Sequence, residues 1–379
     1  MARRLRVGVV FGGRSGEHEV SLASAYGVMT NLDPERFEVV PIGIAKDGGW
    51  LLGGDAWPRL RAAAKLALGP GEDQARVPRA VLDAEVARAA ALAPAGDGVL
   101  AARPEGALGQ LDVVFPVLHG PFGEDGTVQG LLELADLPYV GAGVTASALA
   151  MDKVQTKRVL TAAGLAQCAW REVRRVDFER DPAAVQQALA PLGWPVFIKP
   201  ANLGSSVGIT KAGDDEQLAR GLRLAARYDR RLIVEAAVPN AREIEVSVLG
   251  NDEPEASVCG EIVPSSDFYD FEAKYVLGTS ALLIPAPLPP ALAEEIRALA
   301  LAAYRTLDLA GLSRVDFLLE RDTDRVYLNE VNTLPGFTPI SMYPKLWAAS
   351  GLPYRELLSR LIDLAIARHH DKSRSVTSV

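Results

Sequence analysis

A short apolar run at residues 7–11 is followed at once by the glycine-rich loop Gly12-Gly13-Arg14-Ser15-Gly16. This succession limits the possible folds more than any other feature of the sequence. An apolar run bounded by turn residues is typical of a buried strand, and a helical pattern begins around Glu17. Because strand, tight loop and helix form the opening unit of an α/β sheet, residues 1–150 are predicted to form an α/β domain.

The length and composition fit a soluble protein of two or three domains, with 379 residues of which 49% are hydrophobic. A net charge of −8 disfavours a general nucleic-acid-binding surface. The two cysteines, Cys168 and Cys259, lie far apart, which speaks against structural zinc or a disulfide framework and favours a cytoplasmic location. The apolar runs fall short of a membrane span, so no membrane association is expected.

Two further blocks of strands and helices are predicted at residues 151–240 and 241–370. An Ala-, Pro- and Gly-rich stretch at about 55–107 is predicted to be a surface insertion. The polar tail from His369 onward, including 371–379, is predicted to be disordered. The predicted strands of the two blocks cover 196–199, 232–235, 243–249, 257–262, 315–319 and 326–331. Their predicted helices cover 153–163, 215–227, 290–307 and 353–368.

Three oxygen-bearing side chains, Asp316, Glu330 and Asn332, stand on two of these predicted strands. Side chains alternate faces along a strand, so the three converge if the strands pair. Carboxylate and amide oxygens are the ligands that Mg²⁺ prefers beside substrate phosphates. Arg314 shares a face with Asp316 and would meet negative charge on the same ligand. The alternative is a solvated hairpin with ordinary surface charges.

Two glycine-containing turns could bind anions. Lys199 ends an apolar strand, and the loop Gly204-Ser205-Ser206-Val207-Gly208 that follows offers N–H and hydroxyl donors to phosphate oxygens. It lacks the GK[ST] sequence of a Walker A loop, and a flexible turn is the alternative. A second turn, at residues 332–337, comes directly after the oxygen cluster. Its backbone amides could approach a developing oxyanion closely.

Taken together, these segments resemble the ATP-grasp superfamily and, within it, the D-alanine–D-alanine ligases. The resemblance covers most of the chain outside the 55–107 stretch. It implies a mixed α/β ATP-grasp fold of three domains, in which a Rossmann-like N-terminal domain precedes two subdomains that clasp the nucleotide. The segments that carry the resemblance are 12–21, 119–126, 151–153, 199–208, 268–275, 314–316 and 329–336.

The resemblance implies roles for residues at the amino-acid site. Glu17 would receive the ammonium group of the first D-alanine and form a hydrogen-bonded triad with Ser205 and Tyr275. Arg314 and the backbone of Gly336 would stabilise the tetrahedral intermediate. The other substrate contacts that it implies are His119, Lys274 and Ser341.

For the nucleotide, the resemblance implies that Lys153 and Lys199 hold the phosphates. Glu235 to Val238 would form the adenine hinge, and Glu243 would bind the ribose. Two Mg²⁺ ions, replaceable by Mn²⁺, would bind at the oxygen cluster, and a monovalent cation is a further candidate. The other ATP contacts that it implies are Ser205, Ser206, Ala236, Ala237, Val238, Lys274, Asn329 and Glu330.

One departure from the family concerns Ala236-Ala237, where relatives often have a lysine and a bulky residue. Adenine contacts at this position should therefore come from the backbone. Single residues also have simpler interpretations. Glu17 could favour its helix N-terminus electrostatically, His119 could be a hydrogen-bonded core histidine, and Ser341 could be a helix cap.

The implied reaction is ATP-dependent ligation of two D-alanine molecules through a D-alanyl phosphate, releasing ADP and phosphate, for peptidoglycan precursors. The enzyme would be a cytoplasmic homodimer. An acyl phosphate must be shielded from water, so residues 264–279, which carry Lys274 and Tyr275, are predicted to form a closing lid. The alternatives are a related ligase that takes D-serine or D-lactate, although Tyr275 speaks against lactate, and a non-catalytic nucleotide-binding regulator.

Overall fold

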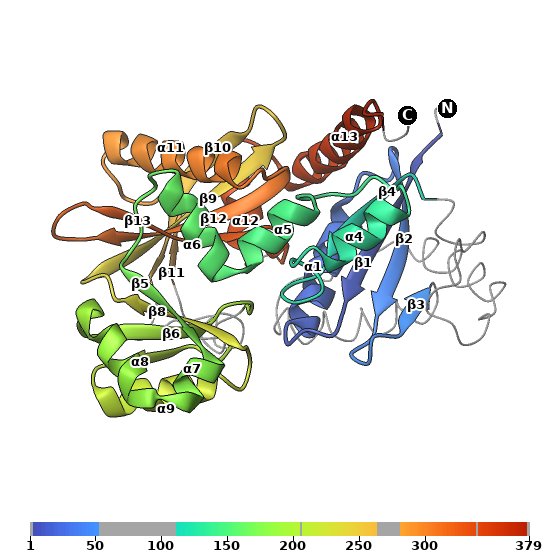
Figure 1. The fold of residues 1–379 in the computed structure, drawn as a ribbon. Helices are drawn as coiled ribbons and strands as arrows, with labels where there is room; N and C mark the ends of the chain where they lie inside the picture. Colours follow the sequence, from blue (N-terminus) through green and yellow to red (C-terminus); the bar gives the residue numbers. More distant parts are fainter. Residues whose placement is uncertain (1–2, 53–110, 205–206, 264–280, 339, 377–379) are drawn as a thin grey trace.

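The computed structural model describes residues 3–52, 111–204, 207–263, 281–338 and 340–376. Three β-sheets, each with its own helices, make up this part of the chain. Figure 1 shows the N-terminal sheet on the right, the C-terminal sheet at the upper left and the central sheet below it. Among the described residues, none of the helices combines the length and apolar character needed to cross a bilayer.

The N-terminal sheet has the order β3-β2-β1-β4, in which β1 runs parallel to both of its neighbours. The last six residues of β1 are buried, as the apolar pattern predicted, and the strand leads through the glycine loop into α1. The predicted strand–loop–helix opening is therefore confirmed. The strands are β1 (Leu5–Gly12), β2 (Phe37–Ile44), β3 (Trp50–Leu52) and β4 (Val113–Val117), and the helices are α1 (His18–Asn31), α4 (Thr127–Leu134) and α5 (Val144–Met151).

The central sheet is antiparallel, with the order β5-β8-β6-β7. Its first helix, α6, begins after Asp152 because that carboxylate accepts hydrogen bonds from the N–H groups of Val154 and Gln155. The strands are β5 (Trp170–Arg174), β6 (Val196–Pro200), β7 (Thr210–Ala212) and β8 (Arg231–Ala236). The helices are α6 (Lys153–Ala162), α7 (Arg175–Arg180), α8 (Pro182–Leu189), the 3₁₀ turn η3 (Ala190–Leu192) and α9 (Asp215–Ala225).

The C-terminal sheet is also antiparallel, with the order β11-β10-β9-β12-β13. All four strands predicted for this block are present. The strands are β9 (Ala241–Gly250), β10 (Glu255–Val263), β11 (Ala281–Leu283), β12 (Gly311–Glu320) and β13 (Val326–Asn332), and the helices are α11 (Pro290–Thr306), α12 (Met342–Ala349) and α13 (Tyr354–Lys372).

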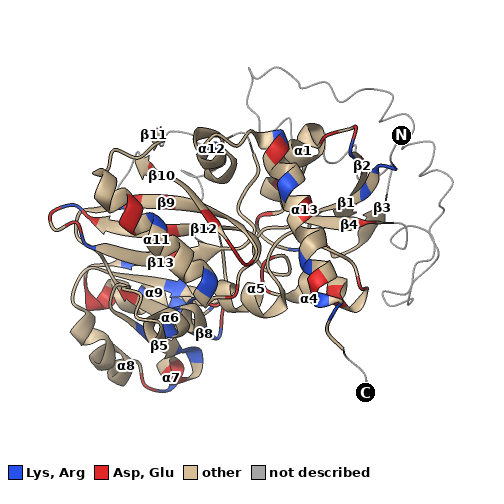
Figure 2. Ribbon diagram, turned by 90° about the horizontal axis from the view of Figure 1, so that it is seen from above, with Lys and Arg blue, Asp and Glu red and all other residues tan. Residues whose placement is uncertain are grey.

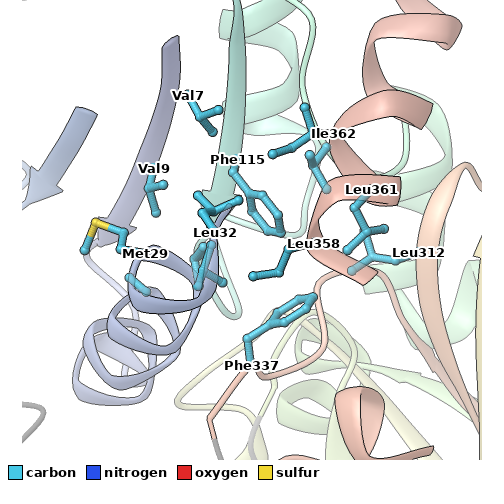
Figure 3. Close-up of a cluster of buried hydrophobic side chains, with 14 of the residues drawn as sticks. Val7, Val9, Met29, Leu32, Phe115, Leu312, Phe337, Leu358, Leu361 and Ile362 are labelled. Carbon is cyan, nitrogen blue, oxygen red and sulfur yellow. The ribbon is translucent and has the colours of Figure 1, made fainter. Parts of the chain in front are cut away.

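The last helix, α13, packs against the N-terminal domain. Its buried Leu358 and Ile362 share one hydrophobic core with Val9 and Phe115 of the first sheet, and Phe337 joins the same core from the loop after β13 (Figure 3). The first and third sheets are thus joined through apolar packing. Burial of this kind stabilises the junction through the hydrophobic effect.

The prediction of a disordered tail from His369 was wrong for its first residues, because α13 continues to Lys372. Two contacts with the N-terminal domain hold this last turn. Lys372 forms an ion pair with Glu133, and His369 Nε2 lies 3.1 Å from Asp136 Oδ1. The end of the helix is therefore fixed by contacts with residues far away in the sequence.

Candidate active site

The predicted oxygen cluster lies where β12 and β13 pair. In the antiparallel register Asp316 stands opposite Glu330, and Arg314 stands opposite Asn332. Asn332 Nδ2 donates a hydrogen bond to Asp316 Oδ2 over 2.9 Å. The prediction that these strands pair and bring the side chains together is confirmed. Figure 2 shows acidic residues along this part of the sheet, near the middle of the molecule.

Arg314 is fixed by two carboxylates. Its guanidinium donates two hydrogen bonds of 2.7 Å to Asp316, and its Nε lies 3.1 Å from Glu245 Oε2 on β9. Burial opposes the charged guanidinium, but the carboxylates of Asp316 and Glu245 raise the pKa of Arg314 above its usual value. The arginine therefore stays charged, and the two carboxylates fix the direction of its guanidinium.

A buried cluster of two lysines and one carboxylate lies in the central domain. Glu235 is 3% exposed, with its Oε1 2.7 Å from Lys157 Nζ and its Oε2 2.5 Å from Lys199 Nζ. Burial alone would raise the pKa of Glu235, but the two lysines lower it to about 2. For Lys199, the carboxylates of Glu235 and Glu330 outweigh burial and raise the pKa. Two ammonium groups share one carboxylate, so the cluster keeps a net positive charge.

A narrow cavity of about 70 Å³ lies between the domains. Its wall includes Glu124 from the N-terminal domain, Lys153 from α6 and Glu330 from β13. Lys153 is oriented by a 2.5 Å hydrogen bond from its Nζ to the carbonyl oxygen of Leu203, and burial lowers its pKa. Ligand pockets usually have volumes of roughly 300–1,000 Å³, so the described walls enclose only part of a nucleotide site.

A wider surface depression of about 400 Å³ lies on the central domain. Its lining includes Arg158, Glu172 and Arg231. These arginines are engaged with carboxylates, since Arg158 and Arg231 both pair with Glu172, and Arg231 also pairs with Asp152. The depression is therefore an ion-paired surface, and the smaller interdomain cavity is the better candidate for chemistry.

Glu17 lies at the junction of the N-terminal and central domains and is 8% exposed. It occupies the cap position of α1 without forming a side-chain cap hydrogen bond. A Cβ atom added at Gly120 or at Gly204 would lie 2.7 Å from Glu17 Oε2 in either case. The carboxylate thus packs against backbone from two domains, which favours a role at the site over a purely electrostatic role at the helix end.

Glu124 connects two loops that meet at the cavity. One carboxylate oxygen accepts a 2.7 Å hydrogen bond from the Gly120 N–H, and the other accepts a 3.0 Å bond from the Leu334 N–H. Burial, with a contribution from the nearby charge of Glu17, raises the pKa of Glu124 to about 8. The loop after β13 is therefore tied to the N-terminal domain at this point.

His119 is buried, and both of its ring nitrogens contact protein atoms. Nδ1 lies 2.9 Å from the Leu334 carbonyl oxygen, and Nε2 lies 3.1 Å from Ser24 Oγ. Ser24 Oγ also accepts a 3.1 Å hydrogen bond from the Phe337 N–H. Burial lowers the pKa of His119 and favours its neutral form. The described contacts agree with the simpler interpretation of this residue as a hydrogen-bonded core histidine.

Gly336 and Ser341 approach each other closely. A Cβ atom at position 336 would lie 2.7 Å from Ser341 Oγ. Ser341 precedes α12, and its hydroxyl accepts a 3.0 Å hydrogen bond from the Thr338 N–H. The loop therefore requires a glycine for its close approach to this serine.

The predicted adenine hinge, Glu235 to Val238, begins with the last two residues of β8 and continues past the end of that strand. The N–H groups of Ala236 and Ala237 donate to the carbonyl oxygens of Ala169 and Pro195. The side chain of Glu235 is engaged with Lys157 and Lys199, and the adenine-binding role of this segment stays a prediction.

Two further predicted nucleotide contacts lie on strands of the C-terminal sheet. Glu243 lies on β9, opposite Leu318 of β12. Asn329 lies on β13 next to Glu330, at a register shift of the β12–β13 pair: Glu330 stands opposite Asp316, Leu328 stands opposite Phe317, and Asn329 is the extra residue between them.

Several predicted features lie outside the described residues, and their roles stay predictions. They comprise the surface insertion at 55–107, the lid at 264–279, and the side chains of Ser205, Ser206, Lys274 and Tyr275.

Two charged residues of the site, Lys157 and Glu245, had no predicted role. Lys157 carried a signal in the sequence, because it shares the buried side of α6 with Val154 and Leu160, where a lysine is unusual. Glu245 shares a strand face with Glu243, between the buried apolar residues of β9. A charged residue on the buried side of its helix identifies Lys157, whereas Glu245 stands on the polar face of its strand and carries no such sign.

Comparison with known proteins agrees with this geometry. The family model described as D-ala D-ala ligase N-terminus matches residues 6–142, and the model described as D-ala D-ala ligase C-terminus matches residues 159–363. The chain is 52% identical over 371 residues to a D-alanine–D-alanine ligase of Thermoanaerobacter sp., an alignment that covers 97% of this chain and 98% of that protein. It is 49% identical over 364 residues to the enzyme of that name from Deinococcus radiodurans, covering 95% and 98%.

Solved structures give the same result. The D-alanine-D-alanine ligase from Coxiella burnetii matches with a TM-score of 0.78 and 34% identity, covering 98% of this chain and 97% of that one. The VanG D-Ala:D-Ser ligase from Enterococcus faecalis matches with a TM-score of 0.77 and 34% identity, covering 96% of this chain and 100% of that one. The predicted three-part ATP-grasp fold agrees with these matches, and the chain belongs to the D-alanine–D-alanine ligase family.

Proposed function

We propose that the protein joins two D-alanine molecules in an ATP-dependent reaction that passes through D-alanyl phosphate. The observation that carries this proposal is the convergence of Arg314, Asp316, Glu330 and Asn332 on two paired strands. The neighbouring central domain supplies Lys153 to the cavity that Glu330 and Asn332 also line. Cations and oxygen ligands around one cavity suit transfer of a phosphoryl group to a carboxylate.

The donor set fits Mg²⁺. Asp316 and Glu330 stand opposite each other in the strand register, and Asn332 lies within hydrogen-bond distance of Asp316. Two carboxylates and an amide, without thiol or imidazole, are hard oxygen donors that leave coordination positions for phosphate oxygens. We assign both predicted metal ions to these residues, with Mn²⁺ as a substitute. Bound metal would neutralise charge on the transferring phosphoryl group.

Other residues of the protein bind the nucleotide phosphates and the amino acid and stabilise the oxyanion. Lys153 and Lys199 supply positive charge for the ATP phosphates, and the buried carboxylate of Glu235 orients Lys199. Glu17 receives the ammonium group of the first amino acid. Arg314 and the N–H of Gly336 stabilise the oxyanion that forms when the second amine attacks the acyl phosphate.

The identity of the second substrate rests on the relatives. The curated relatives named above are D-alanine–D-alanine ligases, whereas the VanG enzyme is a D-Ala:D-Ser ligase. Higher sequence identity to the former favours D-alanine over D-serine. Four further predictions accompany this proposal: a homodimer, a cytoplasmic location, a monovalent-cation requirement and a role in peptidoglycan precursor synthesis. Sedimentation of the purified protein tests whether it is a homodimer.

The test is ADP release by the purified protein with ATP, Mg²⁺ and a panel of D-alanine, L-alanine, D-serine and D-lactate. We expect release that depends on D-alanine, with D-alanyl-D-alanine as the product. ADP release only with D-serine or D-lactate added to D-alanine would identify the alternative ligases. Nucleotide-dependent thermal stabilisation without turnover would identify a regulator and refute the proposal.

A further inference from the structure

The loop that follows β13 is attached to the N-terminal domain along its length. Leu334 and Phe337 are 3% and 2% exposed, so their side chains are fixed in the core. The Phe337 ring meets the Phe115 ring edge to face, with centroids 5.7 Å apart (Figure 3). Gly336 lies between these anchors and is half-buried.

The donor and the acceptor of each hydrogen bond that His119 and Ser24 form with this loop can be assigned. A carbonyl oxygen only accepts hydrogen bonds, so His119 Nδ1 carries the proton that is donated to the Leu334 carbonyl. In the neutral ring Nε2 is then an acceptor, and the Ser24 hydroxyl must donate to it. The oxygen of Ser24 in turn accepts from the Phe337 N–H. Ser24 and His119 thus hold the loop on both sides of Gly336.

The backbone N–H of Gly336 is the hydrogen-bond donor of this loop that can bind a ligand. Among the described residues, its N–H has no protein acceptor, whereas the N–H groups of Leu334, Phe337 and Thr338 all have one. A half-buried N–H group held in this way is suited to an anionic ligand. Its direction depends on the carbonyl of Leu334 and the N–H of Phe337, which are the groups held by His119 and Ser24.

We propose that Ser24 and His119 act together as positioning residues that aim the Gly336 N–H at the reacting carbonyl oxygen. This inference rests on the proposed function, in which Gly336 stabilises the oxyanion. It assigns a role to Ser24, and it gives His119 a role different from contact with the first D-alanine. Both ring nitrogens of His119 are already engaged with protein atoms.

The kinetic test compares Ser24→Ala, His119→Asn and the double variant. A misdirected oxyanion donor costs roughly ten- to hundredfold in rate, so we expect kcat to fall by about that factor in each single variant. The KM values for ATP and D-alanine should change less than about twofold. Because the two residues form one chain, the double variant should be about as slow as either single variant.

A matched control is Ser359→Ala, which removes a buried serine hydroxyl that, in the described part of the chain, donates its hydrogen bond to the Arg355 carbonyl within α13. This variant should retain the kcat of the unaltered protein. Any of three results would overturn the proposal. The KM for D-alanine could rise in His119→Asn but not in Ser24→Ala, or the rate loss of the double variant could equal the product of the two single losses. The kcat of Ser24→Ala could also stay within twofold of that of the unaltered protein.

A second measurement does not depend on turnover. The chain has four histidines, so ¹⁵N imidazole resonances can be assigned by substituting each in turn. We expect His119 to carry its proton on Nδ1 at neutral pH, and loss of the Ser24 hydroxyl should shift the Nε2 resonance. A proton on Nε2 would overturn the network. Failure of the proposed function would instead appear as no ADP release from the unaltered protein.

Discussion

Replacement of Glu235 with glutamine tests the buried charge cluster of the central domain. The carboxylate contacts Lys157 and Lys199, which lower its pKa from 4.5 to about 2. The two values differ by about 2.5, and each pKa unit corresponds to about 1.4 kcal/mol, so the ionised form is stabilised by on the order of 3 kcal/mol. The Glu235→Gln variant should lose about this much free energy of unfolding at pH 7.

The pH dependence has a defined sign. The pKa of Glu235 is lower in the folded state than in the unfolded state. Its stabilising contribution is therefore complete above about pH 4.5 and is lost as the pH falls toward about 2. The difference in stability between the unaltered protein and Glu235→Gln should shrink over this same range.

The assay is urea unfolding between pH 7 and pH 3, with amide hydrogen exchange of β6 and β8 to report on the central domain. The matched control is Glu216→Gln, which removes an exposed ion pair with Arg220 on α9 and should change the unfolding free energy by less than about 0.5 kcal/mol. If Glu235→Gln stays within about 1 kcal/mol of the unaltered protein at pH 7, or if the difference is independent of pH, the reasoning is refuted.

Three further predictions concern the site. Lys157→Met leaves Lys199 and Glu235 as a neutral pair, so the KM for ATP should rise several-fold while the KM for D-alanine changes little. Steady-state ADP release measures both KM values, and an equal rise in the two would contradict this prediction. Glu330→Gln removes one proposed metal ligand, and a Mg²⁺ titration of turnover should show a much higher requirement, whereas an unchanged titration would refute that role. Gly336→Ala places a Cβ 2.7 Å from Ser341 Oγ, so kcat should fall and the Tm should drop by a few degrees, a loss that adding Ser341→Ala should partly reverse in Tm; no change on either readout would contradict the close approach.

The sequence predicted those parts of the site that depend on local pattern. Asp316, Glu330 and Asn332 lie on strands joined by a short turn, so alternation of side chains was enough to bring them together. Lys199 likewise follows from its place at the end of an apolar strand. These predictions depend on spacing along one segment of the chain.

Contacts between distant segments could not be predicted in this way. Lys157 meets Glu235 only because α6 packs beside β8, and Arg314 meets Glu245 only because β12 pairs with β9. Helix α13 extends to Lys372 because the N-terminal domain supplies partners for its last turn. Such contacts are set by tertiary packing, which local propensity does not determine.

The most direct test of the account follows one oxygen atom. D-alanine labelled with ¹⁸O in its carboxylate is incubated with the protein, ATP and Mg²⁺, and the released phosphate is analysed by mass spectrometry. If the carboxylate is activated as an acyl phosphate, its C–O bond breaks when the amine attacks, and each dipeptide formed leaves one ¹⁸O atom in the phosphate. Formation of dipeptide with unlabelled phosphate would contradict carboxylate activation by phosphoryl transfer.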